Sequence, residues 1–402
     1  MKIVNKSGVA PMRLLFRNVD RMEVPVTPTA QRLPADILIE IFTQCLPKSH
    51  MLRPSDRDGP LVLTWVCQSW RSTALYCPAL WNALSVMQKK AFTPPQAKIL
   101  DTWINRSGSS LLSIQIHHCD GPCRDGKAAR HILSHHFRLR ALHLYSNYEK
   151  TLCKCFVQVL DHLASSKQLR QMVDFRLTRT YPHQNPLAEV SVDLSYAHHL
   201  STVHLGGYVM VDLRLSSDRF YAMRELRIAS CEPMTCLLIF DRCPSLEILE
   251  IKCIHEQSLN PPFSNRRARK LHTLLLDAHP NFIRHILQHV NMPSLLNLSL
   301  SSERGFIDGQ LFTQQGYHLE SIHISGALLI PHTLVVILRQ MPSLKSLRTS
   351  LLPYRRNPNF RSIPYETAIL MHRSMPLAQL HIQKGRYPNY RRHRTSVHCS
   401  ES

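Results

Sequence analysis

The chain has 402 residues, 44% of them hydrophobic, which is enough for a large core or for roughly two to three domains. Its 49 Lys and Arg against 28 Asp and Glu give a net charge of +21, which suggests acidic partners: nucleic acid, an anionic membrane or an acidic protein. Because the charge is spread along the sequence, we prefer to interpret it as a solvated basic face. The 12 glycines argue against a Gly-rich nucleotide-binding protein, and the 12 scattered cysteines are too few for a disulfide scaffold.

Targeting signals are not recognisable in the sequence. Residues 1–20 lack the pattern of a secretory signal, and no apolar run reaches the length of a membrane span. We therefore expect a cytoplasmic or nuclear protein with free thiols and no membrane partner.

Residues 1–30 contain Pro11, Pro25 and Pro28 without a sustained period, so we expect a mobile N-terminal arm. A helix is predicted over residues 33–46. Pro34 suits a first helical turn, Asp36 suits the positive end of the helix dipole, and Pro47 ends the helix. Its apolar residues recur at three-and-four spacing: Ile37, Leu38, Ile41, Phe42 and Cys45.

A second helical stretch covers residues 61–75, after a polar loop. Leu63, Val66, Cys67, Trp70 and Ala74 lie on one side of it, Pro78 stops it, and Leu80-Trp81 follow. Residues 31–81 are too few to be very stable alone. Their apolar residues exceed what two helices can bury against each other, so the excess must meet the rest of the chain or a partner.

These residues resemble a known module. Leu33-Pro34, Asp36-Ile37-Leu38, Ile41-Phe42, Val66–Arg71 and Pro78–Trp81 occur in the order typical of an F-box. The whole chain resembles the F-box-like proteins of mushroom-forming fungi. It departs from the pattern in the long loop at residues 48–60 and in Gln68, where a basic residue is common.

The resemblance implies that residues 31–81 bind a Skp-type adaptor and, through it, the cullin of a ubiquitin ligase. The residues expected to contact the adaptor are Leu33, Pro34, Ile37, Leu38, Ile41, Phe42, Val66, Cys67, Trp70 and Trp81. The alternative is that Leu33, Ile37, Phe42 and Trp70 pack on the remainder of the chain.

Residues 82–110 are interpreted as a helical linker. Pro94–Arg106 is predicted as a helix with Ile99, Leu100, Trp103 and Ile104 apolar, and Trp103 is expected to be a packing residue.

Beyond residue 110 the pattern apolar-x-x-apolar-x-apolar recurs, from Leu111/Ile114/Ile116 to Leu377/Leu380/Ile382. Between Leu200 and Leu344 its starts lie 23, 23, 25, 24, 24 and 25 residues apart, within the leucine-rich-repeat period. Apolar helical stretches precede it, often ending in Pro-Ser-Leu. We therefore predict one short parallel strand per unit over residues 111–383, stacked on a continuous core.

The repeats are irregular. The Asn or Cys usual after the strand is missing from most units, and Asp174 occupies a position where an apolar residue is expected. The fold class predicted is α plus α/β, a short helical F-box followed by an irregular, twisted solenoid. The rival is a generic α/β domain with parallel strands, and the even spacing favours the solenoid. A basic, disordered tail is expected over residues 384–402.

Polar residues between the apolar strand positions are expected to line the concave face and contact a protein substrate. They are His143, His204, Arg227, Glu250, Ser299, His323 and Arg348. The expected function is that of a substrate-recognition subunit of a cullin–RING ligase. The alternatives are a nucleic-acid-associated scaffold or a ligase-independent interaction scaffold.

We expect no catalytic residue, cofactor or metal in this chain. His117-His118-Cys119 with Cys123 lacks a second ligand pair at finger-like spacing, and Cys153 and Cys155 are interpreted as structural thiols. Nucleophile-elbow, phosphate-loop and His-Glu-x-x-His motifs are not present.

Overall fold

The computed structural model describes 18 segments of the chain. They are residues 33–46, 51–53, 59–88, 94–118, 131–146, 154–165, 169–179, 189–193, 196–207, 210–214, 220–229, 231, 233–252, 265–302, 318–326, 341, 343–351 and 380–382. The expected arm at 1–30 and tail at 384–402 lie outside them.

The N-terminal part is helical. It contains α1 (Ala35–Cys45), α2 (Pro60–Val66), α3 (Gln68–Leu75) and the short 3-10 helix η2 (Pro78–Trp81). The stretch 61–75, expected as one helix, is divided because Cys67 has extended backbone angles (φ −157°, ψ 174°). The division lets the Cys67 sulfur accept the Trp70 backbone N–H at 3.5 Å, which caps α3.

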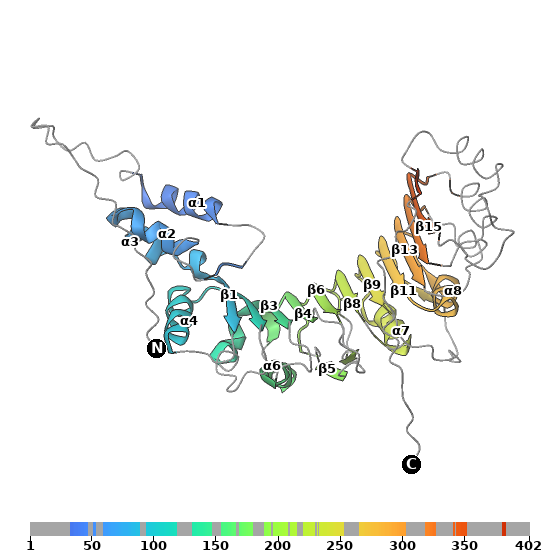
Figure 1. Cartoon of the computed structure of the whole chain (residues 1–402), viewed down its shortest axis with the longest axis horizontal. Helices are drawn as coiled ribbons and strands as arrows, with labels where there is room; N and C mark the ends of the chain where they lie inside the picture. Colours follow the sequence, from blue (N-terminus) through green and yellow to red (C-terminus); the bar gives the residue numbers. More distant parts are fainter. Residues whose placement is uncertain are drawn as a thin grey trace, which may run out of the picture.

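One large sheet forms the body of the protein (Figure 1). Its 12 described strands all pair in parallel, and their order is β1-β2-β3-β4-β6-β8-β9-β11-β13-β14-β15-β16. The strands therefore add in chain order, and the sheet is open. Their bounds are β1 (Ala83–Gln88), β2 (Leu112–His118), β3 (Leu139–Ser146), β4 (Asp174–Arg179), β6 (Thr202–Gly207), β8 (Glu225–Ile228), β9 (Ile248–Lys252), β11 (Thr273–Asp277), β13 (Asn297–Ser302), β14 (Ser321–Gly326), β15 (Ser346–Leu351) and β16 (Leu380–Ile382).

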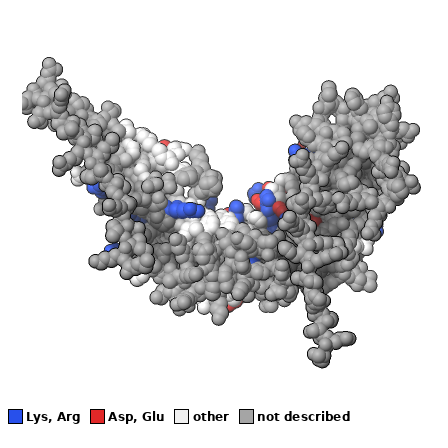
Figure 2. All heavy atoms as spheres, viewed as in Figure 1, with Lys and Arg blue, Asp and Glu red and all other residues white. Residues whose placement is uncertain are grey.

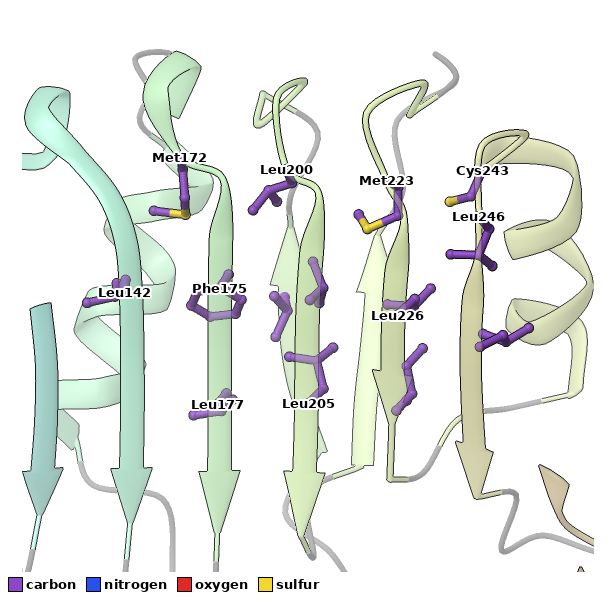
Figure 3. Packing of buried hydrophobic residues seen from close by; sticks show 14 of the residues in the cluster. Leu142, Met172, Phe175, Leu177, Leu200, Leu205, Met223, Leu226, Cys243 and Leu246 are labelled. Carbon is purple, nitrogen blue, oxygen red and sulfur yellow. The ribbon is translucent and has the colours of Figure 1, made fainter. Parts of the chain in front are cut away.

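Residues one repeat apart in the sequence pair with each other on neighbouring strands of this sheet. Leu249 pairs with Leu226 on one side and with Leu274 on the other, so the same apolar position recurs on each strand. Figure 3 shows Met172, Leu200, Met223 and Leu246 at the starts of successive strands. All four are buried.

Backbone hydrogen bonds lock this register before each strand begins. The Leu246 N–H donates to the Cys243 carbonyl (3.2 Å), which forms a tight turn, and Leu200, Met223, Leu295 and Leu344 repeat this turn. The Arg224 carbonyl then accepts the N–H groups of Glu247 (2.8 Å) and Ile248 (2.9 Å) from the next unit. The turn directs the first apolar residue of each unit into the core.

A second layer covers the apolar face of the sheet. It contains α4 (Pro94–Arg106), α6 (Lys154–Ser165), α7 (Pro233–Arg242) and α8 (Pro280–His289), with the short helices η3 (His136–Arg138) and η4 (Leu169–Gln171). Two small parallel sheets, β5 (Glu189–Asp193) with β7 (Met210–Arg214) and β10 (Arg266–Arg267) with β12 (Val290–Asn291), complete it. Figure 1 shows α6, α7 and α8 on the outer side of the curved row of strands. Phe156, Ile239 and Ile283 join the strand residues in one core.

The structure is therefore mixed α/β, and the predicted parallel strands are confirmed. The predicted linker is wrong for its first part, because β1 pairs with β2 and the sheet begins at Ala83. Trp81, Leu84 and Val86 show the same apolar-x-x-apolar-x-apolar spacing as the later units, and all are buried.

Two residues of the early units were placed wrongly by the pattern. Leu111 is 38% exposed and Leu112 is buried, because Leu112 alternates with the buried residues Ile114 and Ile116 along β2. Asp174 does not interrupt the series of buried apolar residues, because Met172, Phe175 and Leu177 are the buried residues of this unit. Asp174 pairs in register with Ala141 and Thr202 on the opposite face.

The helical part is joined to the sheet through Trp81. This side chain is fully buried, its indole N–H donates to the Ala74 carbonyl (2.8 Å), and its ring meets the Trp103 ring edge-on at 4.9 Å. The Arg106 guanidinium lies 4.5 Å from the Trp81 ring centroid. The helices and the sheet consequently share a single core.

Candidate protein-interaction surfaces

Exposed apolar side chains mark the helical part. Ile37 and Ile41 of α1 are 46% and 36% exposed, and Trp65 and Val66 at the end of α2 are 60% and 55% exposed. We name these four residues the helical surface. Large apolar side chains left in water favour a protein contact, and tryptophan is especially enriched among the residues that dominate such contacts.

The residues expected to bind an adaptor separate into three groups. Pro34, Ile37, Ile41 and Val66 are exposed, whereas Leu33, Cys67 and Trp70 are half-buried. Leu38, Phe42 and Trp81 are fully buried. The last three pack inside the chain, so we remove them from the expected contacts.

The reason for the correction lies in α1 itself. The helix carries two neighbouring apolar stripes, Ile37/Ile41 and Leu38/Phe42, each with the spacing of one helical face. Periodicity does not say which stripe meets the core. In the structure Leu38 and Phe42 do, and the Phe42 ring lies 5.0 Å from the Trp70 ring. Phe42 and Trp70 therefore pack within the chain, which was the alternative to their contact with an adaptor.

Trp65 is a surface residue that the sequence reasoning missed. It lies next to the apolar positions assigned to the helix face and was not counted with them. The available signal was composition, because α2 reads PLVLTWV and has apolar residues all round. A helix that short cannot bury all of them.

The second surface is a row of side chains on the face of the sheet opposite the helices. The register places His143, Arg176, His204, Arg227, Glu250, Leu275, Ser299, His323 and Arg348 directly beside one another on consecutive strands. We name this the inner row. It brings together all seven residues expected to line the concave face.

Arg176 and Leu275 also belong to the inner row and were missed. Arg176 was overlooked because the strand containing Asp174 was read in the wrong register. Leu275 stands within the run Leu274-Leu275-Leu276, where alternation is not visible in the sequence, although only Leu275 is half-buried.

Ion pairs form two clusters along the inner row, one on β3 and β4 and the other on β8 and β9. Asp174 accepts from His143 Nε2 (2.9 Å) and from Arg176 Nε and Nη2 (3.0 and 3.1 Å). Arg227 Nε donates to Glu225 Oε1 (2.6 Å), and Arg227 Nη1 donates to Glu250 Oε2 (3.3 Å). We name these six residues, together with His204, which lies between Arg176 and Arg227 in the row, the ion-pair network.

The network sets the charge states of its members. Burial works against ionisation of Asp174, but hydrogen bonds from His143 and Arg176 outweigh it and lower the Asp174 pKa. Burial, followed by the nearby charge of Arg227, lowers the His204 pKa, so His204 is neutral around pH 7. The Asp174 hydrogen bond raises the Arg176 pKa.

Gly206 gives His204 its space. A Cβ at Gly206 would lie 2.9 Å from His204 Nε2 and 3.5 Å from Thr178 Oγ1. Any larger residue at position 206 would therefore displace the His204 ring from its position in the inner row.

The inner face does not carry the positive excess of the chain. Among the side chains that β4 to β15 present on this face, four are basic and four acidic: Arg176, Arg227, Lys252 and Arg348 with Asp174, Glu225, Glu250 and Asp277. Figure 2 shows charges of both signs together at the floor of the hollow. The +21 of the chain must therefore lie elsewhere.

Within the described part of the chain, no group of three or more His, Cys, Asp and Glu is placed to hold a metal ion. His117 stacks on Tyr145 (ring centroids 4.9 Å apart) and contacts Gln115, whereas Cys119, Cys123 and Cys153 lie outside the described residues. No described helix has the length and apolar character to cross a membrane.

Neither a scan against protein-family models nor a search of curated proteins finds a match to this chain.

Proposed function

We propose that the protein is a substrate-recognition subunit of a cullin–RING ubiquitin ligase, acting in the cytoplasm or nucleus. In this proposal residues 31–81 are an F-box that binds a Skp-type adaptor, and the sheet is the inner layer of a leucine-rich-repeat solenoid that holds a protein substrate. The observation that carries the proposal is the exposed helical surface on helices whose opposite sides are buried in the core.

The chain would act by proximity. It would hold a substrate near the enzyme that carries ubiquitin, which raises the effective concentration of substrate lysines without a catalytic residue in this chain. Trp81 supports this role, because a rigid junction between the two surfaces keeps the bound substrate at a constant position relative to the adaptor.

Adaptor binding tests the proposal. The full chain is co-purified with a Skp-type adaptor. Ile37→Asp and Val66→Asp are each expected to reduce the amount of adaptor captured by at least about tenfold. The reason is that each variant places a charge where the adaptor would cover an apolar side chain. Leu238→Asp is the matched control, because Leu238 is 44% exposed on α7, within the repeats. Circular dichroism should show all three variants folded.

Changing Leu33-Pro34 to Ala-Ala is a second test of the same contact. If this variant, Ile37→Asp and Val66→Asp all bind the adaptor as well as the unmodified chain does, the F-box assignment is wrong. A chain that binds no adaptor but still captures proteins through the inner face would be a ligase-independent scaffold.

A nucleic-acid-associated scaffold is the second candidate, favoured by the +21 charge. The balanced inner face does not supply its binding surface. If nucleic acid binds the chain through Lys and Arg contacts to its phosphates, its affinity should fall steeply between about 50 and 200 mM salt because counterions are released. A flat or absent affinity removes this candidate.

A further inference from the structure

The charged groups of the ion-pair network are not mainly cations, although the chain as a whole is basic. It contains the carboxylates of Asp174, Glu225 and Glu250 but the guanidinium groups of only Arg176 and Arg227. The remaining members are histidines, and His204 is held neutral by burial and by the neighbouring arginines. The network therefore has one carboxylate more than it has guanidinium groups.

The three carboxylates of the network accept different numbers of hydrogen bonds, and Glu250 has the most unused acceptor sites among them. Asp174 accepts three hydrogen bonds, and Glu225 accepts a short one of 2.6 Å. Glu250 accepts a single contact, at 3.3 Å, from an arginine that Glu225 already holds more closely. A carboxylate has about four acceptor sites, so most of the capacity of Glu250 is unused by the described residues.

Apolar side chains lie beside Glu250. Its register partner on β11 is Leu275, which offers no hydrogen-bond donor, and Ile248 precedes it on the same face of β9. Both are half-buried, and the Glu250 side chain is 25% exposed. A carboxylate next to exposed aliphatic carbon fits a side chain with an apolar stem and a cationic head.

We propose that Glu250, Leu275 and Ile248 form a binding site for a lysine or arginine side chain of the substrate, carried next to an apolar residue in an extended segment. This inference rests on the proposed function, whose substrate class it names. An acidic segment fits less well, because the nearest guanidinium, that of Arg227, already has two carboxylate partners.

The overall charge of +21 does not prevent this recognition. At about 0.15 M salt the Debye length is roughly 8 Å, so repulsion from distant basic residues is largely screened. The charges within contact distance of the ligand then decide which segment binds.

Peptide binding to the full chain at about 0.15 M salt is the test. The probes are two fluorescent peptides of equal length, one alternating Leu and Arg and the other alternating Leu and Glu. Binding of each peptide is measured by fluorescence anisotropy. We expect the Leu-Arg peptide to bind more tightly. Glu250→Gln should weaken it on the order of tenfold, because one charged contact contributes about 1.4 kcal/mol.

Glu320→Gln is the matched control. Glu320 directly precedes β14, is paired with Lys345 at 2.7 Å and lies outside the network, so its replacement should leave the Leu-Arg affinity unchanged. Equal losses in both variants would show non-specific attraction and overturn the proposal. Tighter binding of the Leu-Glu peptide would also overturn it.

Two further readouts separate this inference from the proposed function. Adaptor capture by Glu250→Gln should equal that of the unmodified chain, so a failed peptide test leaves the adaptor assignment intact. A synthetic peptide of residues 384–402 is the competitor. If it displaces the Leu-Arg peptide at lower concentration than unlabelled Leu-Arg peptide does, the site belongs to a segment of this chain and the substrate assignment fails.

Discussion

Trp81 shows how one residue can serve two parts of the molecule. It ends the helical part, and it also occupies the first apolar position of the earliest strand unit, Trp81/Leu84/Val86. The F-box resemblance drew attention to it as a contact for an adaptor. Its burial, its hydrogen bond to Ala74 and its contact with Trp103 make it a residue of the core instead.

Replacing Trp81 with Phe tests this role. The variant keeps an aromatic ring but leaves the Ala74 carbonyl without its donor, so we expect the free energy of unfolding in urea to fall by about 1–3 kcal/mol. Trp65→Phe, at a side chain 60% exposed, should change it by less than about 0.5 kcal/mol. Equal effects at the two sites would contradict the assignment of Trp81 to the core.

Cys67 acts on the scale of a helix. Its extended backbone separates α2 from α3, and its sulfur accepts the backbone N–H of Trp70 in the first turn of α3. Cys67 is also one of the residues expected to contact the adaptor, and its side chain has the Trp70 N–H as a partner within the chain.

Helix capping predicts the effect of substitutions at Cys67. Cys67→Ala removes the acceptor and should lower the free energy of unfolding by about 1 kcal/mol, whereas Cys67→Ser supplies a better acceptor and should not lower it. Thermal unfolding of the two variants measures the difference. If both variants lose the same stability, the cap contributes nothing.

The strand β11 offers a test of register. Leu274, Leu275 and Leu276 look alike in sequence, but Leu274 is fully buried and Leu275 is half-buried on the inner row. Leu274→Ala should therefore lower the free energy of unfolding by about 2–5 kcal/mol, and Leu275→Ala by less than about 1.5 kcal/mol. Denaturant unfolding that gives the reverse order would place the strand one residue out of register.

Five histidines of the described residues have lowered pKa values and contribute to the acid response of the molecule. Burial is the first cause that lowers the pKa of His117, His135, His162, His204 and His285, and for His285 the pKa falls to about 4 from 6.5. The unfolded chain then binds more protons than the folded chain in this window. Stability must fall as pH decreases from about 6.5 toward 4.

Thermal unfolding as a function of pH checks this prediction. The melting temperature should decrease between pH 6.5 and 4, and His285→Gln should make the decrease smaller. Asp174 acts in a separate window, because its lowered pKa stabilises the folded state above its ordinary value of 3.8 and this contribution is lost at lower pH. A melting temperature that is constant or rises on acidification to pH 4 would contradict the histidine assignment.

The sequence alone determined the parallel strands, their order and most of the inner row. These features depend on spacing, and a period of 23 to 25 residues between apolar positions becomes the register when neighbouring units stack. The seven expected inner residues lie in one row because side chains alternate along a strand.

Only the tertiary structure decided which apolar stripe of α1 is free, that Trp65 is exposed and that the sheet begins at Ala83. Each outcome depends on packing between segments distant in the chain. Spacing identifies a helical face but not its neighbour. The pairing of Glu250 with Arg227, and its position beside Leu275, likewise arises from strands that meet only in the folded protein.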